Sequence, residues 1–451
     1  MKYLAILLAT TAIASCAYIP DERLERDVRQ IVRTRADVEA SWHRDADAQR
    51  VALEKAKALL ADGLGLEEAV QVALLANPDL QIEFERLGIA RAEYIDAITL
   101  PNPVVFASRR RVEDGDGHQT EYGLVQNILA LVRLPIERRV ASFELQAAKL
   151  HMANAVIALA ANTRVAYYEL AAKRRLARLH DQHADAGRLR LELAERYYTA
   201  GNIAAAEREE QRDAAVASRH AQAAAQRELA AATAVLERLL GGLSIADVEL
   251  SDRLAPVPAQ DPEFAPLLAR ALEQNLQIDA YRREVDARTA GRQAIRRTRW
   301  LDELSVGVST EQDPDGTRLT GPDVEFPLPL FSQRQAEVAR GDAVARLAMR
   351  EAEAAALNLR EQLELAFARL VEHRRNVVML RDELLPARER LRDSEQRRQF
   401  FMLEGPFAPL AARQLELEGY EQFIAEVGAY WAARAQLAAL CGNCEAMLGA
   451  P

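Results

Sequence analysis

The sequence has little cysteine, little glycine and few aromatic residues, and it has no long hydrophobic run. Three cysteines in 451 residues cannot form a disulfide scaffold, and 20 glycines with 6% aromatic residues argue against a compact mixed fold. After Ile13, no run approaches the length of about 18 apolar residues that marks a membrane-spanning helix. Alanine and charge are abundant instead, with 28% of residues charged. This balance favours long helices.

The sequence also lacks the features of nucleic-acid binding and of common catalytic sites. Its net charge is −10, and no basic stripe is interleaved with stacking aromatic residues, which argues against a nucleic-acid partner. There is no glycine-rich phosphate loop, no serine elbow, and no histidine placed with a carboxylate and a nucleophile in a known order. We therefore predict that the protein is not an enzyme and has no catalytic residue, resident metal or cofactor.

The N-terminus has the pattern of an export signal. A short positive start precedes an apolar run from Leu4 to Ile13, the length of a signal-peptide core. Small residues precede Cys16, which resembles the lipobox of bacterial lipoproteins, where the signal is cut before a cysteine that carries a diacylglycerol. We predict a signal peptide over 1–15 and lipidation of Cys16. Ala17 rather than aspartate follows, which in that class implies sorting to the outer membrane. The alternative is an ordinary signal cleaved nearby, which small residues also permit.

Proline and glycine are scarce in the middle of the chain. No proline lies between Pro135 and Pro256, so we predict a continuous helix from Pro135 to Ala200, roughly 100 Å long at the α-helical rise. Gly201 can take the left-handed conformation that ends a helix, and a return helix is expected over about 202–240. Apolar residues recur at three- and four-residue steps along the first helix, which predicts a seam for packing against another helix.

The chain contains two similar halves. Segments starting at Val165 and at Leu365 match at a spacing of 200 residues, including a pair of adjacent arginines in each. In the same order, the aromatic pair 197–198 is matched by the pair 400–401. Each half is therefore predicted to contain a helix, a short strand hairpin, a very long helix, a tip and a return helix.

The repeat sets the predicted organisation of the chain. In this alignment Gly201 of the first tip is matched by Gly405 of the second. The predicted parts are a signal peptide (1–15), a lipidated N-terminal helical segment (16–62), a first repeat (63–255), a second repeat (256–446) and a tail (447–451).

Each half contains an extended hairpin. Leu304, Val306 and Val308 alternate with serine and glycine, the period of a strand with one apolar and one polar face. Turn residues follow at 313–316, and a second strand is predicted from about Arg318 to Phe326. The first half has the corresponding elements, namely strand 104–111, turn 114–117 and strand 120–128.

Strands of this length suit a tilted membrane barrel, but four of them cannot close one. Open strand edges are not tolerated in lipid, so membrane-spanning strands would have to be shared among several copies of the chain. The alternative is a small soluble sheet that caps a helical bundle, and periodicity leaves both open. Arginines at 109–111 and 296–297 flank the hairpins, where a headgroup boundary, a lumen and a solvated loop are all compatible with them.

Four segments carry a family resemblance. They are LGLEEAVQVALLANPDLQI from Leu64, ERYYTAGN from Glu195, LPLFSQRQAEVARGDA from Leu328 and FFMLEGPFAPLAARQ from Phe400. Together they resemble the TolC-type outer-membrane efflux proteins, in their lipoprotein subset, over about residues 64–440. The resemblance implies a mainly α fold with a small transmembrane β part. Long α-helical hairpins and four β-strands per chain would form, as a homotrimer, a twelve-stranded β-barrel continued by an α-helical barrel.

The same resemblance implies a function and partners. The chain would be the outer-membrane channel of a tripartite efflux system, a passive conduit for small molecules or ions that extends into the periplasm of a Gram-negative bacterium. Its partners would be outer-membrane lipid, a periplasmic adaptor protein and an inner-membrane efflux pump, while the cargo stays open. The alternative is a lipid-anchored periplasmic helical scaffold, or an adaptor protein without a pore. Adaptors usually pair one hairpin with long soluble β domains, whereas two hairpins share short strands here, which favours the channel.

The resemblance also implies site residues. The helical tips are expected to dock onto the adaptor, through Tyr198, Gly201, Asn202, Phe401, Glu404 and Gly405. The helix ends beside the tips are expected to form the periplasmic constriction, with Arg413, Gln414 and Glu416 as candidates. Several family members have carboxylates a turn or two past the second tip, where this sequence has acids only at Glu416 and Glu418. The departure leaves open an uncharged or arginine-bearing gate, with Glu404 as the alternative acid.

Two further clusters have plainer interpretations. Cys441 and Cys444 have the spacing of a redox or metal pair, but no second pair or nearby histidine completes a zinc site, so a local disulfide or buried thiols are expected. His180 and His183 lie three residues apart and could bind a metal on one helical face. Their polar neighbours favour an ordinary solvated surface, which is our interpretation of the pair.

Overall fold

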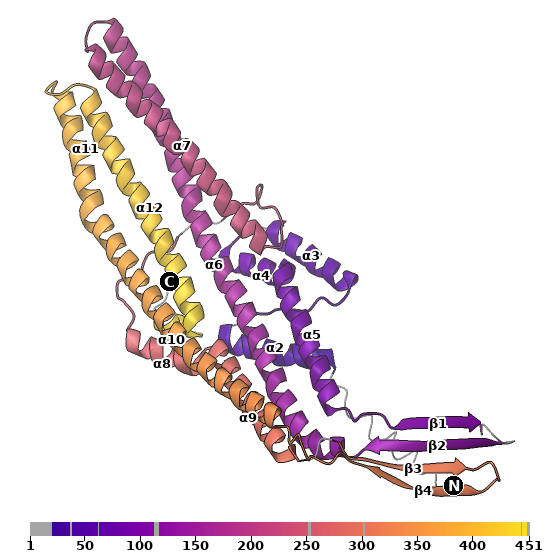
Figure 1. The fold of residues 1–451 in the computed structure, drawn as a ribbon. Coiled ribbons are helices and arrows are strands. Elements are labelled where there is room, and N and C mark those ends of the chain that lie inside the picture. Colours follow the sequence, from indigo (N-terminus) through magenta and orange to yellow (C-terminus); the bar gives the residue numbers. More distant parts are fainter. Residues whose placement is uncertain are drawn as a thin grey trace. The chain divides into compact units, whose positions relative to one another are not determined.

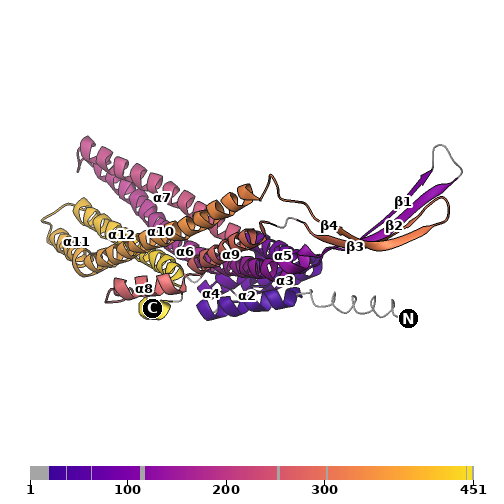
Figure 2. The same cartoon turned by 60° about the horizontal axis from the view of Figure 1, so that its bottom comes forward.

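The computed structural model describes residues 20–36, 38–61, 63–111, 117–250, 254–300, 303–442 and 444–448 (Figures 1 and 2). The predicted signal peptide, Cys16, most of the turn at 114–117 and the tail beyond 448 lie outside the described residues. The described chain is mainly helical and has one four-stranded sheet, as predicted. Among its helices, none combines the length and the apolar character needed to cross a membrane.

The chain forms two compact units. The first consists of the described residues up to Val28, together with Glu83–Met152 and Leu276–Leu357. The second consists of Arg29–Ile82, Ala153–Asn275 and the described residues from Asn358 onward. Each unit contains segments of both halves of the sequence.

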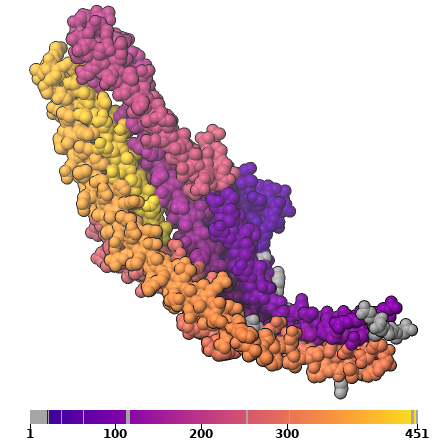
Figure 3. Space-filling model, in the orientation of Figure 1, coloured from indigo at the N-terminus to yellow at the C-terminus, as the bar shows by residue number. Residues whose placement is uncertain are grey.

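The sheet lies in the first unit. Its strands are β1 (Val104–Arg111), β2 (His118–Asn127), β3 (Ser305–Gln312) and β4 (Arg318–Glu325). All neighbouring strands are antiparallel, in the order β1-β2-β3-β4, so both predicted hairpins are confirmed. The central pair β2·β3 joins the two halves of the sequence, and Figure 3 shows the violet strands of the first half beside the orange strands of the second.

Four helices directly precede or follow the strands in the sequence. α5 (Pro78–Ile98) precedes β1, α6 (Leu129–Thr199) follows β2, α9 (Leu276–Thr298) precedes β3 and α10 (Gln335–Met379) follows β4. Within the first unit, α6 and α9 are linked by ion pairs of 2.9 Å between Glu144 and Arg288 and between His151 and Glu284. The N-terminal helix α2 (Asp21–Ala36) contributes Asp27, which lies 2.6 Å from Lys149 of α6.

The second unit contains two helical hairpins. In the first, α6 leads to a tip and α7 (Ala205–Leu239) returns. In the second, α10 continues through η2 (Leu380–Leu384) and α11 (Leu385–Phe400) to a tip, from which α12 (Phe407–Cys441) returns. α6 confirms the predicted long helix, but it begins at Leu129, before the predicted start, so Pro135 lies inside it. In the second hairpin a π-helical turn interrupts the α-helical pattern just before Pro386, because proline has no N–H and clashes with the preceding turn.

One hydrogen bond occurs in the same arrangement in both halves of the sequence. α4 (Leu66–Ala76) ends at Asn77, whose Nδ2 donates to the carbonyl of Leu239 at 2.9 Å, at the end of α7. α8 (Phe264–Gln274) ends at Asn275, whose Nδ2 donates to the carbonyl of Leu440 at 3.1 Å, near the end of α12. In each half, the asparagine that ends the short helix therefore connects this helix to the end of the return helix by a hydrogen bond. The short helix α3 (Ala46–Ala61) precedes α4, whereas no helix lies between α7 and α8 in the residues that the structure describes.

The core of the second unit lies where α12 packs against α6. Trp431 of α12 stacks on Tyr168 of α6, with ring centroids 5.7 Å apart, and its indole N–H donates to the carbonyl of Ala255 at 2.9 Å. Next to this pair, Gly428 faces Ala172, and a Cβ on Gly428 would lie 2.5 Å from the Ala172 Cβ. The helices approach closely at this point because the residue between them has no side chain.

Candidate functional site

The register of the sheet sorts its side chains onto two faces, because residues that pair directly across an antiparallel ladder point to the same side. One row runs from Val105 through Leu124 and Val308 to Pro322. We call the side that carries this row the apolar face. Its apolar members are Val105, Ala107, Tyr122, Leu124, Val306, Val308, Pro322 and Val324.

The apolar face is exposed rather than buried. Val105 is 73% exposed, Val308 56% and Val324 61%. A soluble sheet packs its apolar face on a core, so this arrangement is inverted. The predicted alternation of Val306 and Val308 with serine and glycine is therefore confirmed, and the structure adds that both valines are exposed.

The opposite side, which we call the polar face, carries mostly small and polar residues. These are Ser108, Gln119, Glu121, Gly123, Asn127, Ser305, Gly307, Ser309, Glu311, Gly321, Asp323 and Glu325. The same face also carries Arg110 and four apolar residues, Val104, Phe106, Val125 and Leu319. Glu121 and Glu311 pair directly across β2 and β3, and Gln119 donates a hydrogen bond to Glu311. The ring of Phe106 covers Gly123, where a Cβ would come within 2.6 Å of it. The polar face thus holds four carboxylates among small residues, and Val104 and Leu319 are exposed on it as well.

The sheet is open at both edges. Within the described residues, β1 and β4 each pair with one neighbour only, so each presents one unpaired backbone edge. Arg109 and Arg318 lie in the rows of the apolar face at its turn end, paired with Thr120 and Gln312. An apolar face bordered by arginines is the side-chain distribution expected where a strand leaves hydrocarbon for lipid headgroups.

The predicted first tip is a helix C-cap. α6 ends with Gly201 in the left-handed conformation at a φ of 76°, as predicted. The N–H of Asn202 donates to the carbonyl of Tyr197 at 2.8 Å and that of Gly201 to Tyr198 at 3.0 Å, the two bonds of a Schellman motif. Tyr198 is 39% exposed, with the Arg208 guanidinium 4.3 Å from its ring centroid.

The second tip has the same hydrogen bonds but a different residue at the left-handed position. The N–H of Leu403 donates to the carbonyl of Arg398 and that of Met402 to Gln399, both at 2.9 Å. Met402 has a φ of 58°, whereas Gly405 has no positive φ. The predicted match of Gly201 with Gly405 was therefore wrong, because the chain turns three residues earlier, at a methionine.

The second tip is also strongly apolar and exposed. Phe400 is 81% exposed, Phe401 68%, Met402 93% and Leu403 70%. Glu404, which was predicted as a docking residue, forms an ion pair with Arg398. A continuous run of exposed apolar residues at a helical tip is the kind of surface that a partner protein covers.

The three predicted constriction residues lie near the start of α12, in different surroundings. Glu416 is 2% exposed and pairs with Arg392 at 2.6 Å and Arg413 at 2.5 Å, so its charge is compensated inside the chain. Arg413 has an exposed side chain, and Gln414 accepts a hydrogen bond from Arg190 at 3.2 Å. Their role in a constriction stays a prediction, in which Arg413 rather than Glu416 offers charge to solvent.

The histidine pair and the cysteine pair have clear surroundings. The side chains of His180 and His183 are 19% and 11% exposed and face Glu421 of α12, so their interpretation as a solvated surface was wrong. No sequence pattern indicated Glu421, because it lies on the other hairpin, more than 200 residues away in the chain. Cys441 and Cys444 form a disulfide, one of the two expected outcomes.

An exposed apolar sheet combined with two helical hairpins is the fold of TolC-type outer-membrane channels. The CmeC outer-membrane channel of Campylobacter jejuni aligns with a TM-score of 0.71 at 16% identity, over 85% of this chain and 86% of that one. The outer-membrane protein VceC of Vibrio cholerae aligns with a TM-score of 0.70 at 15% identity, over 84% of this chain and 97% of that one. A membrane protein of Pseudomonas aeruginosa aligns with a TM-score of 0.71 at 20% identity, over 84% and 92%. The sequence itself matches no family model and no curated protein.

Proposed function

We propose that this chain is the outer-membrane channel of a tripartite efflux system and acts as a homotrimer. The observation that carries the proposal is the sheet, whose apolar face is exposed and whose two edges are unpaired within the described chain. Lipid satisfies the apolar face, but it cannot satisfy open backbone edges. β4 of one copy therefore pairs with β1 of the next, and three copies of four strands close a twelve-stranded barrel whose polar face lines the lumen.

The shared barrel can be tested by cysteine cross-linking between β1 and β4 of different copies. We place Ala107→Cys on β1 and combine it in turn with Thr320→Cys, Pro322→Cys or Val324→Cys on β4. All four positions lie on the apolar face, and the scan covers three registers. One combination should give a covalent trimer on denaturing gels.

The matched control is Ser108→Cys with the same three β4 partners. Ser108 is the neighbour of Ala107 but lies on the polar face, so it cannot reach them. The native disulfide keeps Cys441 and Cys444 out of the reaction. If all combinations stay monomeric, or if the control cross-links equally well, the chain does not form a shared barrel. The alternative of a lipid-anchored helical scaffold would then stand.

Channel activity can be tested directly in planar bilayers. The protein extracted from outer membranes with detergent should run as a trimer and conduct ions. If the predicted constriction is correct, Arg413→Glu should change the conductance or ion selectivity, because it reverses an exposed charge. A protein that is silent in the bilayer and released from membranes by salt would contradict the channel.

We further propose that the two tips bind a periplasmic adaptor protein, which couples the channel to an inner-membrane pump. The exposed run Phe400–Leu403 supports this role, because it is apolar and has no cover within the described chain. A photo-crosslinking residue at Leu403 should capture one adaptor protein in the native cell, identified by mass spectrometry. The same residue at Arg350, whose side chain is 80% exposed, is the control. Equal capture at both positions would refute docking at the tip.

A further inference from the structure

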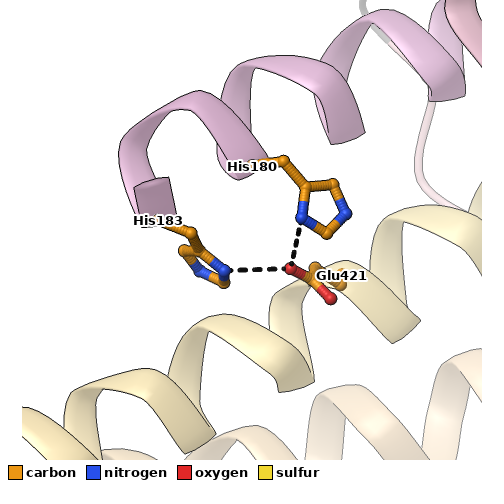
Figure 4. Close-up of side chains that lie close together, drawn as sticks. All are labelled: His180, His183 and Glu421. Carbon is orange, nitrogen blue, oxygen red and sulfur yellow. Dashed lines mark ion pairs between the residues drawn. The ribbon is translucent and has the colours of Figure 1, made fainter. Parts of the chain in front are cut away.

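Two histidines of the first hairpin and one carboxylate of the second form a cluster in the second unit. His180 and His183 lie on α6, and Glu421 lies on α12 (Figure 4). The Nδ1 atoms of the two imidazoles approach the same oxygen, Oε1 of Glu421, at 3.4 Å and 3.1 Å. The rings are edge to face, with centroids 5.9 Å apart.

The geometry of the cluster resembles that of an open metal site. One ligand atom of each residue lies within 4.8 Å of those of the other two. In a tetrahedral site with metal–ligand bonds of about 2.0–2.1 Å, neighbouring ligand atoms are about 3.3 Å apart. The two nitrogen–oxygen distances already have this value. Two histidines and one carboxylate leave the fourth position of a tetrahedral ion to water.

One imidazole nitrogen that faces Glu421 is unsatisfied. His180 Nδ1 is buried and has no hydrogen-bond partner among the described residues. His183 Nε2 is also buried without such a partner, but an ion bound by Nδ1 of that ring would not satisfy it. The approach of His180 Nδ1 to Glu421 is therefore a contact without the geometry of a hydrogen bond. Buried polar atoms are normally paired, and a bound ion is one of the few ways to satisfy an exception.

The cluster lines a cavity that gives an ion room and access. The cavity has a volume of about 240 Å³ and lies between α6, α7 and α12. Two arginines also line it, but Arg190 donates to Gln211 and Arg413 is paired with Glu416. The charge of Arg413 is thus balanced by Glu416, whereas Arg190 hydrogen-bonds a neutral amide, and Glu418 adds a carboxylate to the wall.

The types of ligand in the cluster indicate which metal it would bind. Imidazole and carboxylate together suit borderline divalent ions such as Zn²⁺, rather than Ca²⁺ or Mg²⁺, which prefer oxygen ligands.

We propose that His180, His183 and Glu421 bind one divalent transition-metal cation of the Zn²⁺ type per chain, and that the ion ties α6 of the first hairpin to α12 of the second. The site uses residues of one chain, so the proposal does not depend on the channel function. The ion stabilises the contact between the two hairpins, because its binding free energy adds to that of the folded state.

The proposal is tested with Zn²⁺ alone on the purified full chain, prepared without a polyhistidine tag and without reductant. Calorimetry and competition with a chromogenic chelator should show one saturable site per chain. His183→Gln and Glu421→Gln should each weaken binding on the order of 100-fold or more, since the loss of even an outer-shell partner costs about 10–100-fold. Co²⁺ at the same site should give the absorption spectrum of a tetrahedral ion.

The matched controls are two histidines outside the cluster. His373 forms an ordinary pair with Glu426 at 2.8 Å, without a third ligand, and His220 is an exposed histidine of α7. His373→Gln and His220→Gln should leave the affinity unchanged, and thermal melting without metal should show that every variant is folded. Several weak sites in place of one, wild-type affinity in His183→Gln, or an equal loss in His373→Gln would overturn the proposal. The cluster would then be an ion pair only.

Discussion

The contact between α6 and α12 predicts an unusual response to a single methyl group. Gly428→Ala would place its Cβ 2.5 Å from the Cβ of Ala172, whereas ordinary contacts begin at 3.4 Å, so the helices must separate by about 1 Å. Overpacking of this kind costs about 1–3 kcal/mol. The better helix propensity of alanine offsets about 1 kcal/mol. The expected net loss is up to about 2 kcal/mol.

The matched control is Gly291→Ala in α9. This position is also helical, but a Cβ there meets no atom within 4 Å in the chain, so the same substitution should stabilise by up to about 1 kcal/mol. The two variants therefore differ by about 1–3 kcal/mol, and the difference isolates the close approach of the helices. Midpoints of denaturant unfolding, followed by far-UV circular dichroism in detergent, give the comparison.

A reciprocal exchange sharpens the test. Ala172→Gly combined with Gly428→Ala moves the methyl group from one helix to the other and keeps one methyl group in the gap. The double variant should recover most of the stability, with a favourable coupling of at least about 1 kcal/mol between the two sites. If Gly428→Ala shifts the midpoint as Gly291→Ala does, or if the effects of the two changes simply add, the reasoning from close packing is refuted.

Three further predictions concern the second tip, the cluster of His180, His183 and Glu421, and the sheet. Met402→Gly should stabilise the chain by about 1 kcal/mol or more in the same unfolding assay, because it removes the left-handed strain of a residue with a Cβ; destabilisation would show that the turn does not strain the methionine. Because Glu421 has a lowered pKa in the folded state, its stabilising contribution is present above its ordinary pKa and lost as the pH falls through the folded-state value. Glu421→Gln should therefore flatten the acid limb of a stability-against-pH profile, and an unchanged limb would contradict this. Glu311→Gln combined with Asp323→Asn should lower the cation preference of single-channel currents if the polar face lines the lumen, and unchanged reversal potentials would argue against it.

Local sequence patterns determined the elements of this protein and their order. A helical period that runs without proline from 136 to 199 gives most of α6, and a period of two with flanking turn residues gives β3. These patterns depend only on residues that are close in the sequence, so they can be recognised without knowledge of the tertiary structure. The tip at Gly201 was predictable for the same reason, because only glycine adopts a left-handed turn freely.

Only the tertiary structure decided which distant residues meet. The sequence shows that Val306 and Val308 share a face, but whether that face is buried depends on what packs on the sheet. Glu421 lies on a different hairpin from His180, and their approach requires α12 to pack against α6. The left-handed turn at Met402 is likewise imposed on a residue with no preference for it. In each case the determining interactions are long-range, and periodicity and propensity carry no information about them.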